Sequence, residues 1–511
     1  MSNRTKNAKR NSIWGLINKM VMLLLPFFVK STIIQLVGVE YLGISGLFTS
    51  ILNVLNITEL GLGNAIVYSM YKPIAEDNKE QICALLNFYK KIYRIIGLFI
   101  LIAGLFCLPF LPSIIKSDLP QGMNVYILYL MYLINACVSY WLFSYKRCLL
   151  HAHQREDVLS KVSSVTNILL NVVQLSLLFL FKNYYLFVVA IPIITICHNL
   201  VDGYIVTKMY PEYRPKGSLK KEKIKDIRKQ VVGLSAMRVA TISRNSLDSI
   251  VISAFLGLSM VAVHNNYFYI INALSGIMAV LTDSVAAGIG NSIACESKEK
   301  NHLDMRKINM AYMSITGVFV ACLLCLYQPF MKLWVGEEFV LKNGIMSLYV
   351  LYFYVARVPN IAGRYFDSAG LWWQGKWKCF AETGVNLVLN IVLGYMFGIS
   401  GIIIATVVSA LIINVPLTVN ILFKNYFKTS SKVFYKDQEI MLVGNALAAV
   451  AAWVMCGFLP DFPGIWGQLM ELAIRGIIAV VVWIVVFVPV YCWCDDYRAS
   501  VDWLKVRLLK K

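Results

Sequence analysis

The chain of 511 residues is 58% hydrophobic and only 15% charged, with a formal net charge of +20 and a mean hydropathy of +0.65. This balance excludes an ordinary soluble domain and a disordered chain. Apolar runs that reach the ~20 residues needed to cross a bilayer core recur along the whole sequence. A backbone in lipid must satisfy its own hydrogen bonds, so these runs predict an all-α integral membrane protein.

The apolar runs predict fourteen membrane-spanning helices. In chain order they cover residues 13–37, 43–70, 92–115, 123–146, 161–181, 185–208, 231–256, 261–292, 309–331, 343–366, 379–398, 400–423, 439–459 and 467–493.

The basic residues orient these helices. Segments on the side of the N-terminus hold 38 Lys and Arg residues, whereas the opposite side holds only Lys116, Lys182, Lys332 and Lys342. Because cytoplasmic loops carry the excess of Lys and Arg, both termini are expected in the cytoplasm. The basic residues are spread over eight short segments and form no single patch, so nucleic acid is not an expected partner.

Matched stretches predict an internal repeat. The sequence GLGNAI at 61–66 matches GIGNSI at 288–293, and NILLNVV from Asn167 matches NLVLNIV from Asn386. Such ordered matches predict two parallel six-helix lobes, formed by helices 1 to 6 and 7 to 12, with helices 13 and 14 outside the repeat. The expected organisation is an N-terminal lobe at 1–209, a basic cytoplasmic linker at 210–230, a C-terminal lobe at 231–425, and two additional helices with a basic cytoplasmic tail at 426–511.

The chain resembles the multidrug/oligosaccharidyl-lipid/polysaccharide (MOP) exporter superfamily, and within it the Wzx-type flippases. The stretches that carry the resemblance are LPFFVKSTIIQLVGVEYLGISGLFTSILNVLNITELGLGNAIVYSMYKPIAEDN and KKIYRIIGLFI. The resemblance implies two lobes that alternate between inward and outward openings in the bacterial cytoplasmic membrane. The implied cargo is an undecaprenyl-pyrophosphate-linked oligosaccharide for O-antigen, capsule or exopolysaccharide. The polysaccharide polymerase and chain-length machinery are the implied protein partners.

Cations deep within helices are candidates for binding the cargo, because a charge at the bilayer centre is costly and is generally functional. Lys19 and Lys30 are eleven residues apart in helix 1 and share one face. Helix 7 contributes Arg238 and Arg244, and helix 10 contributes Arg357. In the alternative interpretation, Lys19 extends its charge to the interface and Arg244 pairs with Asp248 at i+4. Arg475 lies outside the repeat and is expected to pair with Glu471.

Three carboxylates within helices, Glu59, Asp248 and Asp283, are candidates for coupling transport to a Na⁺ or H⁺ gradient. The resemblance to the lipid II flippase implies a Na⁺ site made of Asp248, Asn386, Asn390 and Thr406. The alternative is that Arg244 neutralises Asp248. Asn167 and Asn171 repeat the Asn386 and Asn390 spacing, so both pairs are also candidates for plain helix packing.

No catalytic residue, cofactor or resident metal site is expected, apart from the Na⁺ site. The sequence HAH at 151–153 and the Cys322 and Cys325 pair lack second ligand pairs. A multidrug exporter of the same fold is the alternative function, although the helix cations argue against a cationic cargo. A membrane-embedded polysaccharide polymerase or ligase is a further alternative, but every outer loop is roughly a dozen residues or fewer and too short for a catalytic platform.

The orientation is tested by reporter fusions. Reporters fused after residues 118 and 335 are expected to report the outer side, and one fused after residue 218 the cytoplasm, since the basic residues define the inner side. A single reversed reporter contradicts the fourteen-helix topology.

Overall fold

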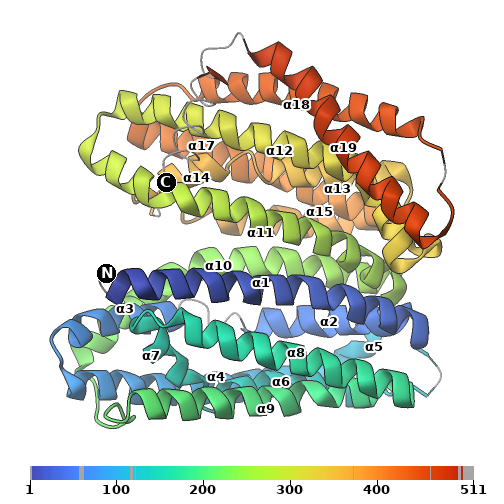
Figure 1. The fold of residues 1–511 in the computed structure, drawn as a ribbon. Coiled ribbons are helices and arrows are strands. Elements are labelled where there is room, and N and C mark those ends of the chain that lie inside the picture. Colours follow the sequence, from blue (N-terminus) through green and yellow to red (C-terminus); the bar gives the residue numbers. More distant parts are fainter. Residues whose placement is uncertain are drawn as a thin grey trace. The chain divides into compact units, whose positions relative to one another are not determined.

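The computed structural model describes residues 3–56, 62–115, 119–120, 122–371, 373–460, 462–492 and 497–498. Helices account for nearly all of these residues, as the composition predicts (Figure 1). Contacts divide the chain into two compact units, which we call unit 1 (Met1–Ala262) and unit 2 (Val263–Lys511).

Unit 1 contains ten α-helices and the first residues of an eleventh. These are α1 (Asn3–Leu36), α2 (Val39–Leu55), α3 (Leu62–Ala75), α4 (Lys79–Cys107), α5 (Leu111–Ile114), α6 (Val125–Trp141), α7 (Arg147–Ala152), α8 (Glu156–Phe181), α9 (Tyr184–Met209) and α10 (Lys221–Leu256). The short 3₁₀ turns η2 (Leu108–Phe110) and η3 (Ser144–Lys146) connect them. Within this unit α1 packs on α8, α6 packs on α4 and α9, and α10 packs on α2 and α3.

Unit 2 contains most of α11 and the remaining helices. These are α11 (Leu258–Cys295), α12 (Lys298–Val335), α13 (Asn343–Val355), α14 (Asn360–Ser368), α15 (Lys378–Phe397), α16 (Ile399–Ser409), α17 (Val415–Leu422), α18 (Lys432–Gly457) and α19 (Gly464–Tyr491). The 3₁₀ turn η4 (Glu337–Phe339) and the π-helical turns η5 (Ala410–Asn414) and η6 (Phe423–Phe427) complete it.

Eleven helices in the described part of the chain are long and apolar enough to cross a membrane, or twelve if the bent pair α6 and α7 is one span. The predicted span 43–70 corresponds to α2 and α3, which flank residues outside the described ranges. The predicted span 231–256 lies in α10, where most side chains are likewise not described. The described residues thus confirm a multi-pass, all-α membrane protein, but not fourteen spans.

Two predicted spans are broken rather than continuous. The helix expected at 123–146 bends by 46° between α6 and α7, where Phe143 adopts a left-handed conformation with φ of 51°. The helix expected at 343–366 is interrupted between α13 and α14, where Pro359 has no N–H to donate.

The packing within each unit follows the order expected of a repeat. In unit 1, α4 packs on α6, α6 on α9, and α8 on α9; in unit 2, α12 packs on α13, α13 on α16, and α15 on α16. Numbered as the fourteen predicted helices, the pairs in unit 1 are 3 with 4, 4 with 6, and 5 with 6. The pairs in unit 2 are 9 with 10, 10 with 12, and 11 with 12, so each helix number is six higher than its counterpart in unit 1. Gly38 and Gly257, which are 219 residues apart as Asn167 and Asn386 are, both have a positive φ, of 114° and 84° respectively. The six-helix repeat stays a prediction. The boundary between the two units lies after α10, whereas the predicted boundary between the lobes lies before residue 231, within α10.

Close helix contacts in both units depend on glycine. A Cβ added at Gly43 of α2 would lie 2.0 Å from the Leu258 carbonyl oxygen. A Cβ added at Gly317 of α12 would lie 1.6 Å from Asn445 Oδ1 of α18. That oxygen accepts a hydrogen bond of 3.1 Å from the indole N–H of Trp483 in α19. Asn445 Nδ2 in turn donates to the Met313 carbonyl at 3.3 Å. These contacts hold the two C-terminal helices against α12.

We expect Gly317→Val to destabilise unit 2, because its side chain overlaps Asn445 and separates α18 and α19 from α12. Overpacking of this kind costs about 1–3 kcal/mol. Thermal unfolding of the detergent-solubilised protein measures the effect. Gly384→Ala is the control, since a Cβ at Gly384 of α15 meets nothing within 4 Å. Equal melting temperatures for the two variants would contradict this account of the packing.

Candidate functional site

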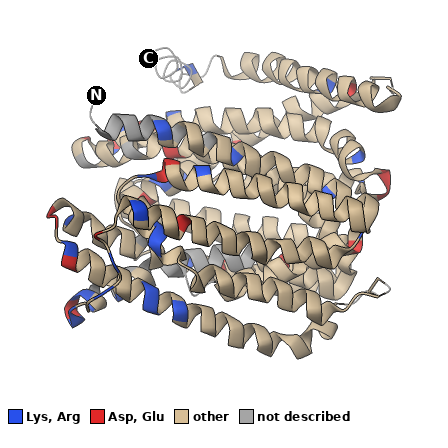
Figure 2. Ribbon diagram, turned by 60° about the horizontal axis from the view of Figure 1, so that its bottom comes forward, with Lys and Arg blue, Asp and Glu red and all other residues tan. Residues whose placement is uncertain are grey.

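The predicted cargo-binding cations lie in both units. Lys19 and Lys30 are on α1, where Lys19 is exposed and Lys30 is half-buried. Arg238 and Arg244 are in α10, and their side chains lie outside those described. Arg357 follows the end of α13 in unit 2. Figure 2 shows that most Lys and Arg residues gather near helix ends, which leaves few cations along the helices.

Arg357 is held against α11. Its guanidinium lies 5.0 Å from the Phe353 ring centroid, and its Nη2 donates to Ser275 Oγ. Seven residues later, Arg364 Nη2 donates to Thr282 Oγ1 at 3.1 Å and forms an ion pair with Asp283. Their partners Ser275 and Thr282 are also seven residues apart, which is two turns of α11, so the two arginines bond to one side of this helix.

Arg364 is a functional candidate that the sequence analysis missed, because it lies near the cytoplasmic end of the predicted helix 343–366 and was grouped with the basic residues of that side. The structure places it inside α14, within reach of Thr282 and Asp283 on α11. Its partner Asp283 was a predicted ion-coupling carboxylate. The ion pair with Arg364 offsets the charge of Asp283, whose side chain is 64% exposed.

Three of the four predicted Na⁺ ligands meet in unit 2. Asn386 and Asn390 on α15 are fully buried, and Thr406 on α16 is 4% exposed. Asn386 Nδ2 donates to Thr406 Oγ1 at 3.2 Å, and Asn390 Nδ2 donates to Asn386 Oδ1 at 3.3 Å. The fourth, Asp248, is a buried residue of α10 in unit 1. The remaining predicted carboxylate, Glu59, lies outside the described residues.

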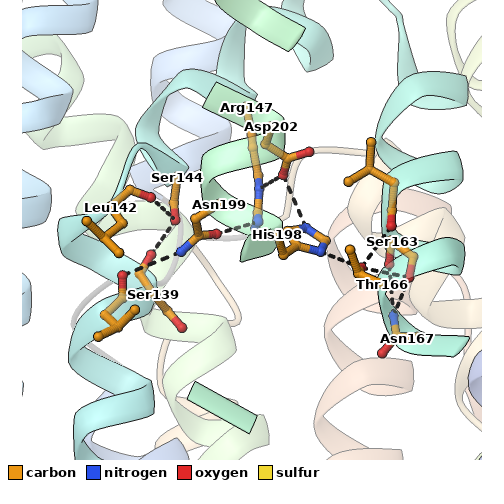
Figure 3. A network of polar contacts seen from close by, with 12 residues as sticks. Ser139, Leu142, Ser144, Arg147, Ser163, Thr166, Asn167, His198, Asn199 and Asp202 are labelled. Carbon is orange, nitrogen blue, oxygen red and sulfur yellow. Dashed lines mark hydrogen bonds and ion pairs between the residues drawn. The ribbon is translucent and has the colours of Figure 1, made fainter. Parts of the chain in front are cut away.

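Unit 1 contains a buried polar network that the sequence analysis did not predict (Figure 3). Its centre is Asp202 on α9, which is 1% exposed. Arg147 Nε on α7 forms an ion pair with Asp202 Oδ2, and Arg147 Nη2 donates to Asn199 Oδ1 at 2.7 Å. His198 Nε2 lies 3.1 Å from the same Asp202 oxygen. The His198 and Asp202 spacing of four residues is the sequence signal for this pair.

The network continues from α9 into α8. His198 Nδ1 lies 2.6 Å from Thr166 Oγ1, which also donates to the Val162 carbonyl of its own helix. Asn167, a member of the predicted repeat, donates to the Ser163 carbonyl at 2.7 Å. Asn167 is half-buried, whereas its repeat counterpart Asn386 is fully buried and bonds to a second helix. The two matched positions therefore have different environments.

Two cavities of unit 1 adjoin this network. A cavity of about 460 Å³ lies among α1, α6, α7, α8 and α9, and is lined mainly by hydroxyl, amide and imidazole groups. A cavity of about 430 Å³ is lined by residues of α3, α4 and α7, among them Tyr71, Tyr89 and Tyr93. The two cavities share Arg147, His151 and Glu156. The polar network thus forms part of the walls of a space inside unit 1.

The fold is that of the transporters of the MOP superfamily. The chain is similar to the lipid II flippase MurJ in an inward closed conformation, with a TM-score of 0.68 at 14% identity over 94% of this chain and 98% of that one. It is similar to an inward-facing multidrug resistance MATE family transporter, with a TM-score of 0.58 at 16% identity over 83% of this chain and 99% of that one.

A MOP superfamily transporter from Pyrococcus furiosus matches with a TM-score of 0.54 at 16% identity over 83% of this chain and 97% of that one. No family model matches the sequence, and no curated protein does. At these identities the likeness confirms the predicted superfamily fold, while membership of the Wzx-type flippases stays a prediction.

Proposed function

We propose that the protein is a flippase that moves undecaprenyl-pyrophosphate-linked oligosaccharides across the bacterial cytoplasmic membrane for synthesis of a surface polysaccharide. The supporting observation is the extent of the likeness to the lipid II flippase, which covers 94% of this chain against 83% for the MATE transporter. The more extensive likeness favours a lipid-linked cargo over the multidrug alternative.

Lys30 on α1 and Arg238 on α10 are the proposed ligands of the pyrophosphate. Lysine and arginine both bind phosphate oxygens, and a diphosphate needs fixed positive charge to offset its loss of hydration in the membrane. Lys19, Arg244 and Arg357 are proposed to assist along the path. Arg357 has its guanidinium already directed to Ser275 and Phe353, so its part in this proposal is a stationary charge rather than a mobile clamp.

Coupling to a Na⁺ or H⁺ gradient is a further part of the proposal. Asn386, Asn390 and Thr406 supply a compact group of neutral oxygen ligands, and Asp248 is the candidate carboxylate to complete it. Asp283 fits this role less well because its carboxylate already forms an ion pair with Arg364. Glu59 stays a candidate by its position in the sequence alone.

We expect Lys30→Ala and Arg238→Ala each to reduce surface polymer tenfold or more in a flippase-null strain, since a charge-assisted hydrogen bond contributes about 1.5–3 kcal/mol. Lys30→Arg and Arg238→Lys are expected to retain partial activity because they keep the charge. Membrane levels of each variant are measured in parallel. Lys91→Ala, an exposed cation of α4, is the control and should retain full activity.

Full activity of the Lys30→Ala, Arg238→Ala double variant would refute the pyrophosphate ligands. Polymer synthesis that persists after deletion of the gene, with no second flippase present, would refute the proposed function itself.

We expect Na⁺ to raise the melting temperature of the purified protein relative to K⁺ at equal ionic strength, because an ion that binds only the folded state stabilises it. Asp248→Asn and Thr406→Val should each abolish the difference, and Thr166→Val in unit 1 should leave it unchanged. Indistinguishable melting curves of the wild type in Na⁺ and K⁺ would exclude the Na⁺ site and leave proton coupling as the alternative.

A further inference from the structure

The two cavities of unit 1 together form one candidate binding space, which we call the α7 cavity pair. They lie on the helices around α7 and share Arg147, His151 and Glu156. Their volumes of about 460 Å³ and 430 Å³ fall in the range of small-molecule sites. The chemistry of their walls identifies the class of ligand.

The basic side chains in these walls already have carboxylate partners. Arg147 is paired with Asp202, and His198 lies against the same carboxylate. His151 Nδ1 and Glu156 Oε1 form a second pair. A pyrophosphate needs positive charge that is not already offset by a carboxylate. The α7 cavity pair therefore suits an uncharged ligand better than the anionic part of the cargo.

One of the two cavities offers hydroxyl and amide groups. Its hydroxyl and amide lining consists of Asn18, Ser139, Ser160, Ser163, Thr166, Asn167, Thr195 and Asn199. Several of these groups bond to the backbone of their own helix: Asn167, for example, uses its Nδ2 to reach Ser163, which leaves its side-chain carbonyl as an acceptor. A wall of this kind matches a ligand whose hydroxyls both donate and accept.

The other cavity offers an aromatic wall. Tyr89 and Tyr93 pack edge to face with ring centroids 4.3 Å apart, and Tyr89 Oη donates to Tyr93 Oη at 2.7 Å. Tyr71 lines the same cavity and is 46% exposed. Gly63 faces this wall, where an added Cβ would lie 3.0 Å from Tyr89 Oη. Tyrosine joins an apolar ring face to a polar tip, as a ligand with apolar C–H faces and hydroxyl edges requires.

We infer that the α7 cavity pair binds uncharged sugar residues of the transported glycolipid, apart from the cations that hold its pyrophosphate. A pyranose ring has hydroxyl edges for the amide and hydroxyl wall and C–H faces for the tyrosine wall. This inference rests on the proposed function, because it assigns the sugar of the same cargo to a separate site. Unit 1 then discriminates between oligosaccharides, and the headgroup ligands accept any lipid pyrophosphate.

The test compares two lipids on the purified full-length protein in nanodiscs. One is undecaprenyl pyrophosphate without sugar, and the other is the undecaprenyl-pyrophosphate-linked oligosaccharide extracted from the host strain. The wild type is expected to bind the sugar-bearing lipid at least tenfold more tightly. Asn167→Leu and Tyr71→Leu should each lower this ratio at least fivefold and leave binding of the sugar-free lipid unchanged.

Matched controls lie one helical turn away. Asn171 is on the same helix as Asn167 and lines neither cavity, and Tyr68 is 66% exposed and precedes Tyr71 by three residues. Asn171→Leu and Tyr68→Leu should keep the wild-type ratio. Because Tyr71 is exposed, Tyr71→Leu tests the site even where Asn167→Leu does not fold.

Each other outcome overturns a defined part of the proposal. A wild-type ratio near one, or an unchanged ratio in both cavity variants, overturns the sugar site and leaves the flippase function standing. If the cavity variants lose affinity for both lipids equally, the sugar site is also overturned. The cavity walls would then stabilise the fold or bind the pyrophosphate headgroup. A wild type that binds neither lipid overturns the flippase function together with the sugar site.

Discussion

The constraint on which the structure depends is that the hydrocarbon core of a bilayer supplies no hydrogen bonds. Every polar group that the chain places at this depth must find its partner within the protein or line a space that holds water. Asp202 illustrates the first solution, since Arg147 and His198 surround a carboxylate that is 1% exposed. The cavities beside it illustrate the second. Breaks in the helices supply both, because α7 turns away from α6 and places Arg147 in the wall.

The same constraint explains how much of the fold the sequence predicts. Long apolar runs have one stable backbone conformation in lipid, so the helices at 161–181, 185–208 and 379–398 are found within a few residues of their predicted ends. The breaks were not predicted. Phe143 adopts a positive φ although nothing in its residue type requires it, and Pro359 interrupts a run that hydropathy treats as continuous. Hydropathy measures the free energy of transfer into lipid, which is the same for a bent helix and a straight helix of the same sequence.

The candidate site was predictable only where a single helix determines it. Lys19 and Lys30 share a face through their spacing alone, and the Asn386 and Asn390 pair follows from helical periodicity and the repeat. The contacts of Asn386 with Thr406 required the resemblance, and those of Arg147 with Asp202 required the structure. Those two residues are 55 positions apart, and one sequence carries no signal that joins them. Arg364 was missed for a different reason, namely that it lies near the cytoplasmic end of the predicted helix 343–366 and was grouped with the basic residues of that side.

Under the proposed function, the distribution of charge separates two tasks that a carrier of a lipid-linked sugar must perform. A pyrophosphate is common to all such lipids, so the residues that hold it contribute affinity but no discrimination between cargoes. Discrimination requires protein groups whose hydrogen bonds are left unmade when the wrong sugar binds. Buried amides and hydroxyls meet this requirement, because an unmade hydrogen bond in a buried site costs free energy. Cations inside the α7 cavity pair would bind every anionic lipid and erase the difference. The contacts of Arg147 with Asp202 and of His151 with Glu156 prevent this, because each of these basic side chains already has a carboxylate partner.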